Sequence, residues 1–368
     1  MKSHLFLLQI NFTLPAFKSA LLCFLTAFAA ALIIIPPVIS LIRKYRLYDL
    51  PNARKEHTSP VPTMGGIAIA GGMMISLFLW FPFSTEPAQI AFFFSVIILL
   101  ALGIMDDLKD LSAKYKFLVQ FSLAALVAAA GIRITSFEGL FGIYELPLTA
   151  QFSFTILAIA GITNAFNLID GIDGLAGGIG FMSLTGLGLL LTLNGDANTG
   201  MIAFALAGGL LAFLYFNMNP ARIFMGDTGS LLLGFVSAVL CIRLIQSDHI
   251  SGSGSFYLSP AFILSFVWLP VFDTLRVFGT RLWQGRSPFS PDKTHIHHLL
   301  TNQGFSHAFS SRLICFIHAV ILMEAFWLRQ FSQEVTVIFL FCFMLLATYS
   351  LKYIGLIFST KESSALQE

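Results

Sequence analysis

The stretch Asn164–Gly178, NAFNLIDGIDGLAGG, places a polar, glycine-rich island between two segments that are apolar enough to cross a bilayer. Its polar residues recur at every third position: Asn164, Asn167, Asp170 and Asp173. Four positions at this spacing drift by roughly 180° around a helix, so one straight helix cannot point them all the same way. We therefore predict that a helix breaks after Asp170 and that the neighbouring glycines turn Asp173 into the same space.

A tight solvated turn is the structural alternative for this stretch, since such turns also favour Gly, Asp and Asn. Ionisable groups at a membrane are costly to bury, however, and usually serve a purpose. The pattern therefore favours a cluster of carboxylates and amides at one face of a membrane.

The composition of the whole chain sets the fold class. Hydrophobic residues make up 57% of the 368 residues and charged residues 11%, and the mean hydropathy is +0.83. Such values exclude a soluble domain and predict an all-α, polytopic membrane protein. The four cysteines stand singly in apolar segments, so neither a disulfide framework nor a thiolate metal site is expected. No linker or repeat divides the chain, and we treat residues 1–368 as one domain.

About eleven segments have the length and apolar character of a transmembrane helix. They are residues 15–42, 62–83, 88–105, 117–134, 151–168, 175–194, 199–217, 229–247, 256–274, 311–330 and 335–357. Most of the 21 Lys and Arg residues fall in one set of the connections between these segments. The positive-inside rule then places the N-terminus outside and the C-terminus in the cytoplasm.

With this topology, five polar clusters share the cytoplasmic face, where we expect the active site. The first lies in the loop Tyr48–Gly66, which contains Lys55 and His57. The others are the pair Asp106-Asp107, the stretch Asn164–Gly178 (here called the opening stretch), the segment Asn219–Ser230 with Asp227, and the loop Asp273–Arg312 with three histidines.

The residue types in these clusters indicate metal-assisted phosphoryl transfer. Carboxylates without cysteines suit Mg²⁺ or Mn²⁺, which proteins hold through one or two carboxylates and phosphate oxygens. Nearby Arg, Lys and His side chains suit phosphates. Zinc is the rival ligand for the histidines, but their loop offers no thiolate. Any single basic residue near a membrane can instead serve topology or contact a lipid headgroup.

Four ordered blocks over roughly residues 45 to 305 resemble the polyprenyl-phosphate N-acetylhexosamine-1-phosphate transferase family. The blocks are Asp106-Asp107, the opening stretch, FMGDTGS at Phe224–Ser230 and SPFSPDKTHIHH at Ser287–His298. The resemblance implies a bacterial inner-membrane enzyme that moves a sugar-1-phosphate from a UDP-amino sugar to undecaprenyl phosphate. It further implies Mg²⁺ or Mn²⁺ as cofactor and UMP as product.

The histidine block also points to one branch of this family. The branch that transfers phospho-MurNAc-pentapeptide typically has three consecutive histidines and ten spans, whereas this chain has His295-Ile296-His297-His298 and about eleven. It therefore resembles the branch that uses UDP-GlcNAc and starts a cell-envelope polysaccharide such as O-antigen or wall teichoic acid. One departure is Asp110, which stands where some members have a lysine.

The resemblance assigns roles to individual residues. Asp227 with Asp107 or Asp106 would hold the metal, and Asp106 would steer or deprotonate the acceptor phosphate. Asn167, Asp170, Asp173 and Phe224 would form the uridine side. The catalytic candidates are Asp106, Asp107, Asp170, Asp173, His295, His297 and His298, and the substrate-binding candidates are Asn164, Asn167, Phe224, Arg281, Arg286, Lys55 and His57. We expect Arg281 and His298 to face solvent and to contribute little to folding.

Some alternatives remain open at this level. A transporter or flippase of an anionic lipid or nucleotide sugar is the competing class, although such proteins tend to show inverted repeats and polar groups at the bilayer midplane. The partners that we expect are the UDP-sugar, undecaprenyl phosphate, the bilayer and a second copy in a homodimer, but no nucleic acid. His318 and Glu324 lie inside a predicted span without an assigned role.

Overall fold

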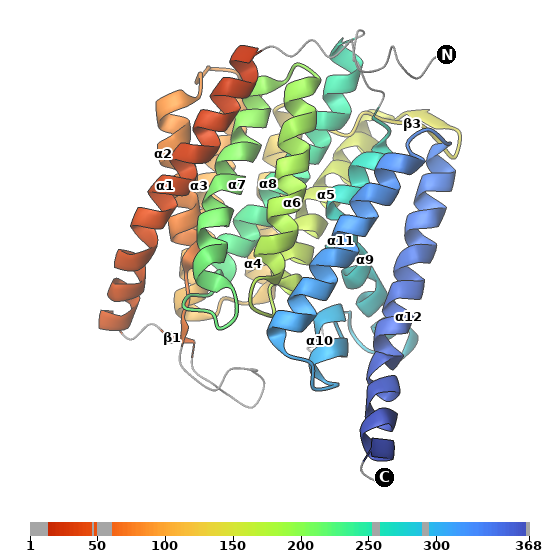
Figure 1. Ribbon diagram of the computed structural model, residues 1–368. Helices are drawn as coiled ribbons and strands as arrows, with labels where there is room; N and C mark the ends of the chain where they lie inside the picture. The colour runs from red at the N-terminus through yellow and green to blue at the C-terminus, as the bar shows by residue number, and fades with distance from the viewer. Residues whose placement is uncertain (1–13, 46–47, 50–60, 252–257, 289–293, 366–368) are drawn as a thin grey trace.

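The computed structural model describes residues 14–45, 48–49, 61–251, 258–288 and 294–365, and it confirms an all-α polytopic membrane protein. Its long helices run side by side along one axis (Figure 1). They are α1 (Leu14–Tyr45), α2 (Gly65–Trp80), α3 (Pro87–Lys109), α4 (Ala113–Ala129), α5 (Leu148–Ile169), α6 (Leu175–Leu193), α7 (Ala197–Asn217), α8 (Gly226–Ser251), α9 (Pro260–Trp283), α11 (His307–Leu328) and α12 (Gln333–Ala365). The helix α10 (Ile296–Thr301) is a short addition before α11.

Each predicted apolar segment coincides with one of the long helices. Nine helices in the described ranges are long and apolar enough to span a membrane. The other two, α2 and α4, have 16 and 17 residues and are shorter than a usual span. The number of eleven crossings therefore stays a prediction, as does the side of the membrane on which each end lies.

Helix α8 forms the centre of the bundle, with 89% of its most apolar window buried. It packs against α2, α3, α5 and α6, which bury its small and aliphatic side chains on every face. A helix that is apolar all round is expected at such a position. Because α8 begins at Gly226, its N-terminus carries Asp227 into the end of the bundle where the predicted polar clusters meet.

Two short antiparallel ladders lie at opposite ends of the bundle (Figure 1). One pairs β1 (Tyr48–Asp49) with β2 (Val61–Pro62), near the end that also holds α10. The other pairs β3 (Ser136–Leu140) with β4 (Ile143–Glu145) and is fastened to the start of α12, because Gln333 donates to the Glu138 carbonyl (2.7 Å). The four cysteines are free, as predicted.

Inside the bundle, His318 of α11 is fully buried and its Nε2 lies 2.9 Å from the Ser183 hydroxyl of α6. That hydroxyl donates to the carbonyl of Phe266 in α9, so the pair joins three helices. Glu324 keeps one buried carboxylate oxygen without a hydrogen bond in the described part of the chain. Both residues lie away from the cavities described below, and His318 has a packing role.

Candidate active site

The helix break predicted in the opening stretch is present. Helix α5 ends at Ile169, Asp170 is its C-cap, and α6 begins at Leu175 after Gly174, whose φ is +76°. A residue with positive φ is most easily a glycine, which explains the composition of this turn. The break releases Asp173 from the helical drift, and its side chain lines the same cavity as Asp170.

This cavity, here called the acidic cavity, has a volume of about 400 Å³. Its walls come from the ends of α3, α5 and α7, the turn before α6, the start of α8 and the first turn of α10. Six carboxylates line it: Asp106, Asp107, Asp110, Asp170, Asp173 and Asp227. Clustered carboxylates raise the free energy of the protein unless a cation lies among them, so the cavity is suited to a cationic ligand.

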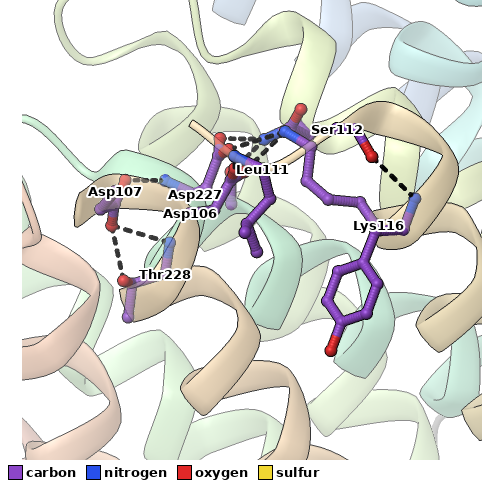
Figure 2. A network of polar contacts seen from close by, with 10 residues as sticks. Asp106, Asp107, Leu111, Ser112, Lys116, Asp227 and Thr228 are labelled. Carbon is purple, nitrogen blue, oxygen red and sulfur yellow. Dashed lines mark hydrogen bonds and ion pairs between the residues drawn. The ribbon is translucent and has the colours of Figure 1, made fainter. Parts of the chain in front are cut away.

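Asp107 anchors the N-terminus of α8. Its carboxylate accepts from the backbone N–H of Asp227 (2.8 Å), from the N–H of Thr228 (3.1 Å) and from the Thr228 hydroxyl (2.6 Å) (Figure 2). A carboxylate at this position satisfies backbone donors that have no partner within the helix. Gly226 makes the approach possible, because a Cβ there would lie 2.7 Å from the Asp107 oxygens. Asp107 thus holds the position of Asp227.

Lys116 of α4 reaches into the same cluster. Its ammonium lies 2.6 Å from the Asp106 carboxylate and 3.1 Å from that of Asp227 (Figure 2). The second oxygen of Asp106 accepts from the backbone N–H of Leu111 at 2.7 Å. Asn167 donates to the other Asp227 oxygen (2.5 Å) and to the Ser230 hydroxyl (2.9 Å). These contacts tie α3, α4, α5 and α8 together at one point.

Asp170 differs from Asp106, Asp107, Asp173 and Asp227, because its carboxylate forms no hydrogen bond within the described ranges. Burial, followed by the negative charges of Asp227, Asp107 and Asp173, raises the pKa of Asp170 to about 8. Such a shift means that the charged form lacks compensation in the protein alone. Asp170 is therefore the member of the cluster best placed to gain from a bound cation.

Asp173 holds the loop between α7 and α8. One oxygen accepts from the Asn219 side chain (3.0 Å) and from the backbone N–H of Ala221 (3.2 Å). Burial alone would raise the pKa of Asp173, but His307 and these two donors keep it below the ordinary value. Asp173 therefore remains charged and organises the wall of the acidic cavity that carries Phe224.

The segment His295–His298, here called the histidine block, contacts α9 through Asp273. This carboxylate, which is 2% exposed, accepts from His295 Nδ1 (2.9 Å), from the backbone N–H of Ile296 (3.1 Å) and from Arg276 (2.7 Å). Arg276 also donates to the Thr294 carbonyl at 2.6 Å. Because a charged carboxylate only accepts, His295 carries its proton on Nδ1.

His297 packs directly onto the break in the opening stretch. A Cβ built on Gly171 would lie 2.3 Å from its Nε2, so any larger residue there would displace this ring. The rings of His295 and His297 are nearly parallel, with centroids 6.0 Å apart, and His298 follows at 4.2 Å from His297. The block thus closes one wall of the acidic cavity, which His297 and His298 line.

A second cavity of about 410 Å³, here called the basic cavity, lies on the other side of this wall. Lys116, Arg281 and the three histidines line it together with the amides of Gln120, Asn164 and Asn167. It shares Asn167, Gly171, His297 and His298 with the acidic cavity. The two cavities are therefore neighbours with opposite charge.

A third cavity of about 980 Å³ continues from the basic cavity between α4, α5 and α9. The two share Ala113, Phe117, Asn164 and Phe278. Most of its lining is aliphatic or aromatic, and we call it the apolar cavity. An acidic, a basic and an apolar compartment thus follow one another.

The sequence-predicted residues divide among these compartments. Asp106, Asp107, Asp170, Asp173, Asp227, Asn167, Phe224, His297 and His298 meet around the acidic cavity. Asn164, Arg281 and His295 belong to the basic cavity instead. Arg286 is exposed and lines none of these three cavities, while Lys55 and His57 fall outside the described residues.

One expectation about the histidine loop is wrong. Arg281 does not face solvent, because only 6% of it is exposed and it donates to the Pro288 carbonyl. His298 is half-buried. Sequence reasoning also missed Lys116 and Asp273 as parts of the site. The sequence did offer a way to find Lys116. It follows Asp106 by only ten residues and lies in the first turn of the next helix, which starts at Ala113, so it could be expected near the aspartate pair.

The fold and the cavities define a polytopic membrane protein with a polar site at one end, built to hold charged groups beside an apolar compartment. Comparison with known proteins narrows this class. A family model described as Glycosyl transferase family 4 matches residues 89–245, which include the carboxylates of α3, the opening stretch and the start of α8.

Curated relatives cover most of the chain. The probable undecaprenyl-phosphate N-acetylglucosaminyl 1-phosphate transferase of Bacillus subtilis (strain 168) is 35% identical over 326 residues, which are 86% of this chain and 89% of that protein. The undecaprenyl-phosphate alpha-N-acetylglucosaminyl 1-phosphate transferase of Yersinia pestis is 32% identical over 76% of each chain. Its counterpart in Escherichia coli (strain K12) is 30% identical over 82% of this chain and 83% of that protein. The chain belongs to glycosyl transferase family 4.

Proposed function

We propose that this protein transfers N-acetylglucosamine-1-phosphate from UDP-N-acetylglucosamine to undecaprenyl phosphate, releasing UMP. The observation that carries the proposal is the contact between the acidic and the basic cavity, with the apolar cavity behind the basic one. The names of the relatives, which cover most of the chain, specify the sugar and the lipid. The product would start a cell-envelope polysaccharide.

The acidic cavity fits a divalent metal ion that comes with the donor. No group of three or more His, Cys, Asp or Glu side chains in the described part of the chain is arranged to hold a metal alone. This agrees with Mg²⁺, which usually takes one or two carboxylates and completes its shell with water and phosphate oxygens. The unpartnered Asp170 and the nearby Asp227 would hold it, with Asp107 fixing Asp227 in place. When bound, Mg²⁺ would neutralise charge on the diphosphate.

The residues of the basic cavity would bind and position the lipid acceptor. Lys116 and Arg281 attract the phosphate of the lipid, whose chain extends into the apolar cavity. Asn167 lies between the two cavities and holds Asp227 by a hydrogen bond. His297 and His298 form the wall that both substrates would contact.

In the reaction, an oxygen of the acceptor phosphate forms a bond to the sugar-bearing phosphorus of the donor, and the bond from that phosphorus to the UMP oxygen breaks. The electron pair leaves with UMP. If the acceptor enters as a dianion, no proton has to be removed, and positioning and charge neutralisation supply most of the rate. If it enters protonated, Asp106 is the predicted base, after release of its oxygen from Lys116.

The proposal is tested with purified protein in detergent, undecaprenyl phosphate, Mg²⁺ and a panel of radiolabelled UDP-sugars. The expected result is lipid-linked GlcNAc diphosphate and UMP in equal amounts. Faster turnover of UDP-MurNAc-pentapeptide would assign the chain to the other branch of the resemblance. Absence of transfer, combined with movement of labelled lipid or nucleotide sugar across proteoliposomes, would favour a transporter.

A further inference from the structure

The basic cavity contains a buried polar side chain that the protein itself does not satisfy. Gln120 of α4 is 5% exposed and lines this cavity. Its Oε1 is buried without a hydrogen-bond partner, and its Nε2, the donor from which a phosphate oxygen can accept, also forms no hydrogen bond within the described part of the chain. Leaving a buried amide unpaired destabilises a protein, so such a group calls for an explanation.

The position of Gln120 relates it to Lys116. The two residues are four apart on α4 and therefore lie on the same face of the helix, one turn from each other. Lys116 reaches toward the acidic cavity, where its ammonium contacts Asp106 and Asp227. Gln120 lies deeper along α4, further from those carboxylates along the helix, and is 95% buried in the wall of the basic cavity. A ligand group that enters this cavity would meet both side chains.

The surroundings of Gln120 select the kind of ligand. Lys116 and Arg281 provide positive charge in this cavity, and Asn164 provides a second amide. These groups suit a phosphate, which accepts hydrogen bonds from cations and amides alike. The cavity shares Phe117 and Phe278 with the apolar cavity, which suits the chain of a lipid.

We propose that the Gln120 carboxamide binds the phosphate of the lipid acceptor, donating an N–H to one of its oxygens beside Lys116. The inference rests on the proposed function and adds a residue that distinguishes the acceptor from the donor. Gln120 is a binding residue here, whose N–H gains a partner only when the acceptor is present.

The test compares Gln120→Met, which keeps a similar shape and removes the amide, with Gln120→Glu, which brings a carboxylate to the phosphate. Gln246→Leu is the control for loss of a glutamine amide elsewhere, because Gln246 also has a buried unpaired Oε1, its Nε2 donates to the Gly131 carbonyl, and it lines none of the three cavities. The measurements are KM for undecaprenyl phosphate, KM for UDP-GlcNAc, and the thermal midpoint in detergent without substrates.

For Gln120→Met, we expect KM for the acceptor to rise about tenfold or more, since a hydrogen bond to a charged group is lost. KM for UDP-GlcNAc should stay within about twofold, and the thermal midpoint should be unchanged or higher, because an unpaired amide has been removed. Gln120→Glu should raise the acceptor KM further, through repulsion between like charges. Gln246→Leu should leave both KM values unchanged.

Three outcomes would overturn the inference. An unchanged acceptor KM in both Gln120 variants would show that the amide does not touch the acceptor. A rise confined to the donor KM would assign Gln120 to the other substrate. A fall in the thermal midpoint of both variants with proportional loss of activity would give it a packing role. If the wild type does not use this pair of substrates at all, the proposed function fails, which is a different result from an active wild type with insensitive variants.

Discussion

The ammonium of Lys116 lies between two carboxylates from different helices, 2.6 Å from Asp106 of α3 and 3.1 Å from Asp227 of α8. It joins the acidic cavity to the basic one, because the same residue lines the second cavity. Through this one side chain, the charge of an entering phosphate and the carboxylates of the acidic cavity influence each other. The first prediction follows from this arrangement.

Lys116→Met should lower kcat/KM by at least about 100-fold, because a positive charge aimed at the reacting phosphates is lost. Lys116→Arg keeps the charge and is the matched control, with activity above that of the methionine variant. Transfer of radiolabelled GlcNAc-1-phosphate to undecaprenyl phosphate measures both. Equal activity of the methionine variant and the wild type would remove Lys116 from the site.

Activity should require Mg²⁺ or Mn²⁺, disappear with EDTA and return when the metal is restored. Asp227→Asn should fall by at least about 100-fold, since it removes a charge at the centre of the acidic cavity. Expression and the size-exclusion profile serve as folding controls. Near-normal turnover of a well-folded Asp227→Asn protein would contradict this assignment.

Asp170 provides a prediction about pH. Its pKa is raised to about 8 in the folded protein, so deprotonation favours the unfolded state as pH rises from about 4 to 8. Without divalent metal, Asp170→Asn should therefore be more stable than the wild type, by a margin that grows over this range. Mg²⁺ should reduce the margin at pH 8, because it compensates the carboxylate in the wild type only. Thermal midpoints at several pH values, with and without Mg²⁺, measure the effect, and a margin independent of pH would contradict it.

The histidine block gives two variants with different expected behaviour. His298→Ala should lose most UDP-GlcNAc turnover with little change in the thermal midpoint, because His298 is half-buried at the cavity wall. Arg281→Ala should lose both turnover and stability, because the buried guanidinium donates to the Pro288 carbonyl. The opposite pattern, with a stable Arg281→Ala protein and an unfolded His298→Ala protein, would reverse these roles.

The topology prediction concerns the sides of the membrane. A reporter fused after Glu368 should be cytoplasmic, and one inserted near Gly252 should be external. In the structure, α12 ends at the same end of the bundle as α10, so the C-terminal reporter also locates the histidine block (Figure 1). Reporters that both lie on one side would refute the arrangement with eleven crossings.

Much of this fold could be predicted, because apolar runs and helix periodicity are local properties of the sequence. The break after Asp170 follows from the conflict between a three-residue spacing and a helix of 3.6 residues per turn. The same drift explains why Asn164 lines a different cavity from Asp170. It lies six residues before Asp170 on one helix and has rotated by about 120°, so it lines the basic cavity instead.

The remaining features depend on contacts between distant segments. Nothing near Asp107 in the sequence indicates that both its oxygens cap a helix, since that helix starts beyond residue 220. Arg281 was expected to face solvent because charged residues near helix ends usually do. In the structure it is buried and donates to the Pro288 carbonyl. The roles assigned to individual site residues stay predictions.

The bond between Asp107 and the N–H of Asp227 joins positions 120 residues apart, and the histidine wall is added later still. Because synthesis proceeds from the N-terminus, α3 enters the membrane with its carboxylates well before α8 or His297 exists. The emerging chain therefore holds charged groups whose partners have not yet been made. A truncated protein that stops before α10 would have the acidic cavity without its closing wall, and ribosome-released fragments of that kind should be inert.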